Sequence, residues 1–455
     1  MTGERRAAAP PLTPRWASLG SAVLLSSSIA LVGVTAIARA YSADVLVLLV
    51  VFAGLLLAGL VFGGALCRPP AWAVVLGGLL GVVGIVVAPP VQYVISNDWL
   101  LIGVLVLAVA GAVPVLLPLV RPELVGWAAG AGLAIAAAGF GLVILGSTPV
   151  IDVWVLLQGA GHGLAGGGNP YELAFPDSPP GQVRDCFTYL PATMLLTAPG
   201  VWLGGDARWA ELVLLVASGA LLSWHLRAGL SWHLRARDGS RLALALLVVV
   251  LPAAGYMLQQ AWTETVVLPA LVGTAVLVDR GRAGWAAVVF GVALASKQHV
   301  LLLVPLLLLC RFRPRELAVT AGTAAALTLP WLLANPARFV GCTVTLFLSV
   351  PPRTDSLSLW LFIPAPARLP VLVVALLAGY LLAWRYCPRT GAGFLVGCAV
   401  VLTTFGLVNK QTFLNQWWLV GALVAAGLAL APRHLVSEAP ETRVSDGRAS
   451  GHLDR

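Results

Sequence analysis

Charged residues are scarce in this sequence. Of its 455 residues, 10% are Asp, Glu, Lys or Arg and 59% are hydrophobic, with a mean hydropathy of +0.92. Soluble domains carry about a quarter charged residues. The composition therefore excludes a soluble enzyme, a nucleic-acid-binding protein and a disordered chain. It predicts an all-α polytopic membrane protein, because about 14 spans of roughly 20 residues would account for most of the apolar content.

Lysine is rarer still, and cysteine follows no metal-binding pattern. Of 28 basic residues, only Lys297 and Lys410 are lysines. The six cysteines show no C-x-x-C spacing, so no cysteine metal cluster is expected. The net charge of +9 comes mainly from arginines in short loops between apolar runs. This is the positive-inside pattern of membrane proteins and does not require a nucleic-acid partner.

The apolar runs predict the topology. Both termini are expected in the cytoplasm, with tails at 1–15 and 433–455 expected to be disordered. The run at 190–203 is expected to be an interfacial helix, because only then do the arginine-rich loops stay inside. The expected spans lie near 16–38, 44–66, 71–93, 99–120, 125–147, 208–226, 241–258, 264–279, 283–297, 298–311, 316–334, 368–386, 391–408 and 413–432.

Polar residues collect in the loops expected outside the cell membrane. A first large outer loop spans 148–207. It carries Asp152 near its start and is rich in Gly, Pro and aromatic residues. A second outer loop at 336–366 contains Arg353. Both lysines also fall on this side, where positive charge is disfavoured. Charged groups at membrane depth are costly unless they are paired or lie in a solvated cavity, so such clusters indicate function.

The acid and the basic residues expected on the outer side match the requirements of one reaction. Moving a sugar from a lipid phosphate to a hydroxyl requires a carboxylate that takes the hydroxyl proton. It also requires cations that stabilise the departing phosphate. The sugar donor, linked to polyprenyl phosphate, would reach the site from the lipid of the membrane.

Five segments in this order resemble the GT-C membrane glycosyltransferases. Within that group they are most similar to the polyprenyl-phosphate-mannose-dependent mannosyltransferases of the glycosyltransferase family 87 type, over about residues 125–432. The segments are Asp152, Gly168-Asn169-Pro170-Tyr171, Phe187-Thr188-Tyr189-Leu190-Pro191, Gly205-Asp206-Ala207-Arg208 and Ala295-Ser296-Lys297-Gln298-His299.

The resemblance implies a GT-C-like core at 121–432 in which Asp152 is the general base of an inverting transfer. It places residues 16–120 as additional N-terminal membrane helices. The sugar would be mannose or a related one, and the acceptor a hydroxyl of a glycolipid, polysaccharide or protein. Candidate donor-phosphate ligands are Lys297, His299, Arg353 and Lys410. Candidate substrate or acceptor residues are Asn169, Tyr171, Tyr189, Asp206 and Glu264.

Several candidates have a structural alternative. His299 could be a buried histidine that only satisfies a neighbouring group. Asp152 or Asp206 could cap a helix, the lysines could be interfacial anchors, and Arg353 could pair with Asp355. Glu264 with Trp262 could be a sugar platform or part of an interfacial aromatic belt. Cys186 and Cys342 could form a disulfide. No metal ligands are assigned, and participation of a divalent cation such as Mg²⁺ or Mn²⁺ stays open.

Two other classes of function stay open. A secondary transporter or lipid flippase would place polar groups at the membrane midplane and show paired repeats, which this sequence does not. A non-catalytic scaffold would have little need for a Gly-rich acidic loop or for two outward-facing lysines.

Overall fold

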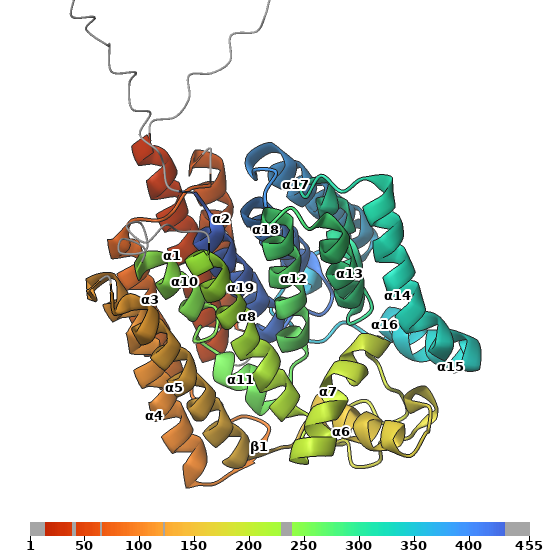
Figure 1. Ribbon diagram of the computed structural model, residues 1–455. Helices are drawn as coiled ribbons and strands as arrows, with labels where there is room; N and C mark the ends of the chain where they lie inside the picture. The colour runs from red at the N-terminus through yellow and green to blue at the C-terminus, as the bar shows by residue number, and fades with distance from the viewer. Residues whose placement is uncertain (1–13, 39–41, 64–65, 122, 229–238, 433–455) are drawn as a thin grey trace, which may run out of the picture.

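The protein is a bundle of helices, seen in the computed structural model in Figure 1. The structure describes residues 14–38, 42–63, 66–121, 123–228 and 239–432. The predicted tail 433–455 and nearly all of the predicted tail 1–15 lie outside these residues. The α-helices of the bundle are α1 (Pro14–Ala38), α2 (Ala43–Gly63), α3 (Ala71–Val87), α4 (Asp98–Leu116), α5 (Val125–Leu145), α8 (Arg208–Ala228), α10 (Gly239–Leu247), α11 (Ala254–Gln259), α12 (Glu264–Asp279), α13 (Ala283–Leu294), α14 (Pro314–Ala334), α17 (Arg368–Tyr386), α18 (Gly391–Val408) and α19 (Leu414–Leu430).

Many of these helices are suited to lipid. Eight helices of the described residues are long and apolar enough to cross a membrane, which confirms an all-α, multi-pass membrane protein. The outermost helices expose apolar side chains: Leu333 on α14 is 73% exposed and Val374 on α17 is 64% exposed. These two surfaces would be unfavourable in water and fit a hydrocarbon environment.

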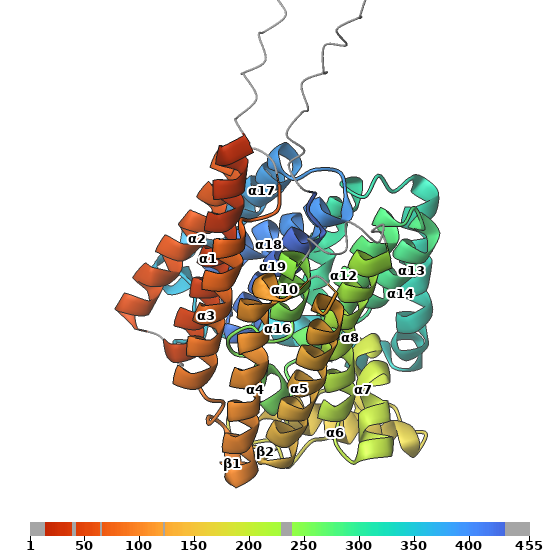
Figure 2. The same ribbon diagram turned by 60° about the vertical axis from the view of Figure 1, so that its left-hand side comes forward.

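The two ends of the bundle differ in composition. The start of α1, the end of α19 and arginines such as Arg68 and Arg241 lie together at what we call the terminal end. There, for example, the Arg68 N–H donates to the Pro432 carbonyl at 3.1 Å. The opposite end, which we call the loop end, holds the long polar segments 146–207 and 335–367. The first segment, with α6 and α7, lies at the bottom of Figures 1 and 2, and α15 and α16 of the second lie higher, at the right in Figure 1.

The N-terminal helices are integrated into the bundle. Helix α1 packs on both α2 and α19, and α4 packs on α5. Strand β1 (Val94–Ser96), after α3, pairs antiparallel with β2 (Ser147–Pro149), after α5, with Ile95 opposite Thr148. This pairing holds the α3–α4 loop against the start of the first large outer loop.

Two of the expected spans are shortened or interrupted where prolines occur. The expected span 71–93 is helical only to Val87, because Pro89 and Pro90 follow directly. The expected span 241–258 is not one helix: α10 ends at Leu247 and α11 begins at Ala254. Pro252 lies in that break, and a proline there could not donate the helical hydrogen bond to residue 248.

The first outer loop carries two helices that stay at the loop end. Helix α6 (Asp152–Ala165) packs on α7 (Pro191–Gly204). The first turn of α7 is held by the Ala192 N–H, which donates to the Ala295 carbonyl, and its last turn lies at the Asp206 turn. Helix α7 packs beside the start of α8, and its expected position along the membrane surface stays a prediction.

A second core lies beneath this loop. Tyr171, in the short 3-10 helix η2 (Pro170–Glu172), packs edge-on against Phe187 and Phe339, with ring centroids 5.6 and 4.8 Å away. Residues 336–349 form α15 (Pro336–Val340), the π-helical turn η4 (Gly341–Thr345) and α16 (Leu346–Ser349). A disulfide joins Cys186 to Cys342, so the two outer loops are covalently linked. The remaining short helices are the 3-10 segments η1 (Leu117–Leu119), η3 (Gln298–Leu308), η5 (Trp360–Phe362) and η6 (Ala365–Ala367).

Helix α7 approaches the start of α8 through a glycine. A Cβ added at Gly200 would lie 2.8 Å from three backbone atoms of residues 206–210, whereas one added at Gly130 on α5 would meet nothing within 4 Å. We expect Gly200→Ala to lower the free energy of unfolding by about 1–3 kcal/mol, because the two backbones must separate.

Thermal unfolding of the detergent-solubilised protein measures this effect. Gly130→Ala is the control and should leave the melting temperature unchanged or slightly higher, because alanine favours a helix more than glycine does. Equal melting temperatures for the two variants would contradict the tight α7–α8 contact.

Candidate active site

A cavity of about 1440 Å³ opens among the loops of the loop end. Its walls come from segments that are far apart in the sequence: the α3–α4 loop, the first outer loop, the α11–α12 and α13–η3 turns, residues 346–360 and the α18–α19 loop. The sequence-predicted site residues that line it are Asp152, Tyr189, Lys297, His299, Arg353 and Lys410. Those that do not are Asn169, Tyr171, Asp206 and Glu264.

Asp152 begins helix α6 and is held by backbone groups. Its Oδ1 accepts the Val153 N–H at 2.8 Å and its Oδ2 accepts the Val183 N–H at 3.2 Å. Its own N–H donates to Gln182 Oε1 at 2.6 Å. Burial raises the pKa of Asp152 above its ordinary value, against the opposing effect of these hydrogen bonds and of Arg353. Asp152 is thus the first residue of α6, and its carboxylate, with a raised pKa, lines the cavity.

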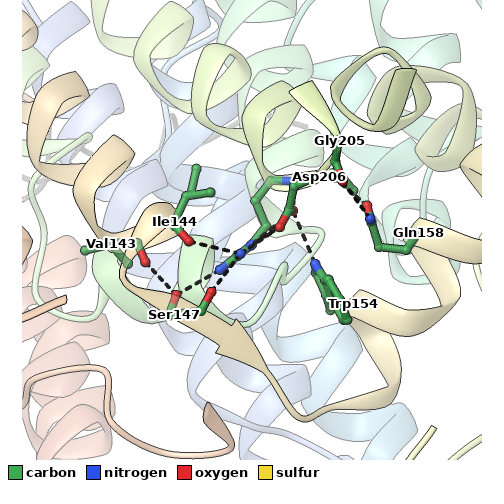
Figure 3. A network of polar contacts seen from close by, with 9 residues as sticks. Val143, Ile144, Ser147, Trp154, Gln158, Gly205 and Asp206 are labelled. Carbon is green, nitrogen blue, oxygen red and sulfur yellow. Dashed lines mark hydrogen bonds and ion pairs between the residues drawn. The ribbon is translucent and has the colours of Figure 1, made fainter. Parts of the chain in front are cut away.

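A buried ion pair fixes the helix that carries Asp152 (Figure 3). Arg208, 3% exposed, binds both carboxylate oxygens of Asp206, with Nη2 2.6 Å from Oδ2. The same guanidinium donates to Ser147 Oγ and to the Ser147 carbonyl, both at 2.9 Å, and so ties the α7–α8 turn to the end of α5.

Helix α6 is attached to this ion pair by two side chains. Trp154 Nε1 donates to Asp206 Oδ1 at 3.2 Å. Gln158 donates to the Gly205 carbonyl and accepts the Ala207 N–H, at 3.0 and 2.7 Å (Figure 3). Asp206 therefore orients α6 from outside the cavity, in place of the acceptor contact expected from the sequence.

Asn169 and Tyr171 also have structural partners. Asn169 Oδ1 accepts the Tyr171 N–H at 3.1 Å and caps η2. The Tyr171 hydroxyl, completely buried, donates to the Tyr189 carbonyl at 2.8 Å. The Gly-rich motif thus shapes the loop, and through it Tyr189, which does line the cavity.

Lys297 reaches the cavity from the turn before η3 and is paired. Its Nζ lies 2.6 Å from Oε1 of Glu264, a fully buried residue at the start of α12, and 5.7 Å from the Tyr189 ring centroid. Asn415 Nδ2 donates to the same carboxylate oxygen at 2.8 Å. Glu264 Oε2 and His299 Nε2 are buried without a hydrogen-bond partner among the described atoms. Glu264 therefore acts on the cavity through Lys297.

The other two cations have weaker partners. Arg353 pairs with Asp355 at 2.6 Å, but the side chains are 52% and 40% exposed, and such pairs contribute about 0–1 kcal/mol. Lys410 Nζ donates to the Leu348 and Val350 carbonyls at 3.2 and 2.8 Å, and no carboxylate of the described part of the chain pairs with it. Burial lowers the pKa of Lys410. Both cations can take an anionic ligand without losing a strong ion pair.

Four residues that line the cavity are not among those predicted from the sequence. Gln92 and Tyr93, from the α3–α4 loop, line it together with Gln260 and Thr263. Gln92 and Tyr93 were assigned to a membrane span. The Pro89-Pro90 pair was the available signal, because it ends the helix before them.

The assembled groups suit a reaction in which a chemical group is transferred to a hydroxyl and an anion leaves. A partly buried carboxylate faces a cavity that also holds Lys297, Arg353 and Lys410. Among the residues described, no group of three or more His, Cys, Asp or Glu side chains could hold a metal ion. The three cationic side chains of the cavity can stabilise a departing phosphate.

Removing the counter-charge of Arg208 tests the positioning role of the network. In Asp206→Asn the buried guanidinium loses its carboxylate, and we expect unfolding to be easier by about 3–5 kcal/mol. Thermal unfolding measures the loss. Asp355→Asn, which breaks the exposed Arg353 pair, is the matched control and should cost less than about 1 kcal/mol. Similar costs for the two variants would contradict the assignment.

Comparison with known proteins found no match that would assign a role to these residues. The sequence matches no protein-family model, and no curated protein matches it.

Proposed function

We propose that this protein is a GT-C-like glycosyltransferase with about 14 membrane-spanning segments. It transfers a sugar, mannose or a related one, from a polyprenyl-phosphate donor to an extracytoplasmic hydroxyl acceptor. The observation that carries the proposal is the convergence of Asp152, Lys297, Arg353 and Lys410 on one cavity. The chain positions of these four residues span more than half of the sequence.

In the proposed step, the acceptor hydroxyl attacks the anomeric carbon of the donor sugar while Asp152 takes the hydroxyl proton. A bond forms between the acceptor oxygen and the anomeric carbon, and the bond from that carbon to the phosphate oxygen breaks. The polyprenyl phosphate leaves with the electron pair. Because attack and departure occur on opposite faces, the anomeric configuration is inverted.

The charges of the cavity support this assignment. Lys410 and Arg353 can turn to a phosphate at little cost, since their present partners are carbonyls and an exposed carboxylate. Lys297 is held by Glu264 at 2.6 Å, so its ammonium is fixed in position for the same anion. Cations fixed before the reaction stabilise a developing negative charge without further reorganisation.

An apolar wall beside the cations suits a prenyl chain. Leu346, Phe347, Leu348 and Leu372 line the cavity together with Lys410 and Arg353. Leu348 is 78% exposed and Phe347 is 38% exposed, so this wall continues onto the outer surface of the bundle. A lipid tail could then lie along the apolar wall while its phosphate contacts the cations.

The charge distribution supports the orientation. Arginines at the terminal end are expected in the cytoplasm of a plasma-membrane protein, which would place the cavity on the extracytoplasmic side. Both termini would then be cytoplasmic.

Turnover of a labelled donor tests the proposal. Purified protein in lipid nanodiscs is given radiolabelled polyprenyl-phosphate mannose and an extract of cell-envelope acceptors. We expect Asp152→Asn to lower kcat by about a hundredfold to ten-thousandfold, as for loss of a general base. Asp98→Asn is the matched control, because Asp98 also begins a helix at the loop end but does not line the cavity.

The pH profile gives a second readout. The acidic limb of kcat/KM should report a pKa above that of an ordinary aspartate, because Asp152 must be ionised to accept the proton. Normal turnover by Asp152→Asn would contradict its role as base. Donor movement between leaflets without donor consumption would instead identify a flippase.

A further inference from the structure

One corner of the cavity carries uncharged polar and aromatic side chains. Gln92 and Tyr93 come from the α3–α4 loop, and Gln260, Trp262 and Thr263 come from the α11–α12 turn. Two hydrogen bonds assemble it: Gln260 Nε2 donates to the Gln92 carbonyl at 3.3 Å, and the Val150 N–H donates to the Tyr93 carbonyl at 2.7 Å.

This corner lies between the acid and a cation. Val150 is two residues before Asp152, so the Tyr93 backbone is held next to the start of α6. Tyr93 also lies close to Arg353, and both side chains line the cavity. A group bound in the corner would therefore lie beside both the proposed base and a proposed phosphate ligand.

Two polar atoms of the corner lack partners. Gln260 and Thr263 are each 1% exposed, and Gln260 Oε1 and Thr263 Oγ1 have no hydrogen-bond partner among the described atoms. A buried polar group without a partner is costly, and native proteins usually satisfy such groups. A ligand with several hydroxyls would supply the missing hydrogen bonds.

The backbone of the corner is strained. Four non-glycine residues of the described chain have positive φ, and two of them belong to this corner: Tyr93 at 51° and Ala261, between Gln260 and Trp262, at 55°. Non-glycine residues in this conformation are uncommon, and they cluster at functional sites. At Tyr93 the strained backbone carries a ring that is 51% exposed at the cavity wall.

We propose that this corner is the acceptor subsite and that it binds a sugar ring. The inference rests on the proposed transferase function and narrows its acceptor to a carbohydrate hydroxyl. The Tyr93 ring offers an apolar face to the C–H groups of the sugar, and the amide and hydroxyl groups of Gln260 and Thr263 bind its hydroxyls.

The subsite gives the N-terminal helices a role. Tyr93 lies outside the part of the chain that resembles the glycosyltransferases, and it reaches the cavity because β1 pairs with β2. The added N-terminal segment thus supplies acceptor specificity, while the charged groups of the core hold the donor.

The experiment measures sugar binding and turnover separately. Protein in lipid nanodiscs is titrated with methyl hexosides and short oligosaccharides, and binding is followed by saturation-transfer NMR. Turnover is followed with radiolabelled polyprenyl-phosphate mannose and the same sugars as acceptors. Tyr93→Gly removes the ring and relaxes the left-handed backbone, so a loss of binding cannot come from added strain.

We expect Tyr93→Gly to weaken binding of the best sugar, and to raise its KM as acceptor, by about tenfold. Tyr93→Phe keeps the ring and should bind the sugar as the wild type does. Trp127→Leu on α5 removes an aromatic ring that is 81% exposed and does not line the cavity, and serves as the control.

Three results separate the proposals. If no sugar binds the wild type, or if Tyr93→Gly binds sugars as well as the wild type, the subsite is wrong. If a Ser/Thr peptide shows the Tyr93-dependent binding in place of the sugars, the acceptor class is wrong. If sugars bind through Tyr93 but the wild type does not consume donor, the sugar subsite stands and the transferase proposal falls.

Discussion

A charge at the edge of a membrane needs a counter-charge, hydrogen-bond donors or acceptors, or water. The loop end of this protein meets that need in two ways. Arg208 and Asp206 neutralise each other in a buried pair that fixes α6. Asp152 and Lys410 are held by backbone groups and face a cavity. The first arrangement makes the scaffold rigid, and the second leaves charges available for chemistry.

The scaffold and the cavity depend on each other. Asp152 begins α6, α6 is tied to Asp206 through Trp154, and Asp206 is held by Arg208. The disulfide from Cys186 to Cys342 joins the two outer loops, and Cys186 itself lines the cavity. The walls of the cavity are therefore held by the Arg208–Asp206 pair outside it and by a covalent link at its edge. Binding energy for a lipid donor can then go to the phosphate and the sugar, because the loops are already ordered.

Much of the fold could be predicted from hydropathy and arginine placement. Long apolar runs correspond to helices such as α2, α5 and α18, because a membrane helix must be apolar along its length. The limits of the helices were less predictable. The expected spans 71–93 and 241–258 were set by hydropathy, although Pro89 and Pro252 interrupt the helices locally. The number of spans stays a prediction.

Part of the site could also be predicted. Charge scarcity drew attention to Lys297 and Lys410, and both line the cavity. The Gly-rich motif predicted that Tyr171 contacts the substrate or acceptor, but Tyr171 is buried in the core of the loop. Pro89-Pro90 indicates that Tyr93 lies outside the helix. Its place at the cavity depends on the pairing of β1 with β2, which join segments about 50 residues apart, and that pairing could not be predicted. Such long-range contacts leave no local signal in one sequence.

The central claim is that the acid and the cations of the loop end surround one lipid-linked phosphosugar. Electron cryomicroscopy of the protein in lipid nanodiscs with a non-hydrolysable polyprenyl-phosphonate sugar tests it directly. The account predicts density for the phosphonate at Arg353 and Lys410, with the anomeric carbon facing Asp152 and the prenyl chain along Leu346–Leu348. Density for the phosphonate outside this cavity, or with its sugar turned away from Asp152, would contradict the account.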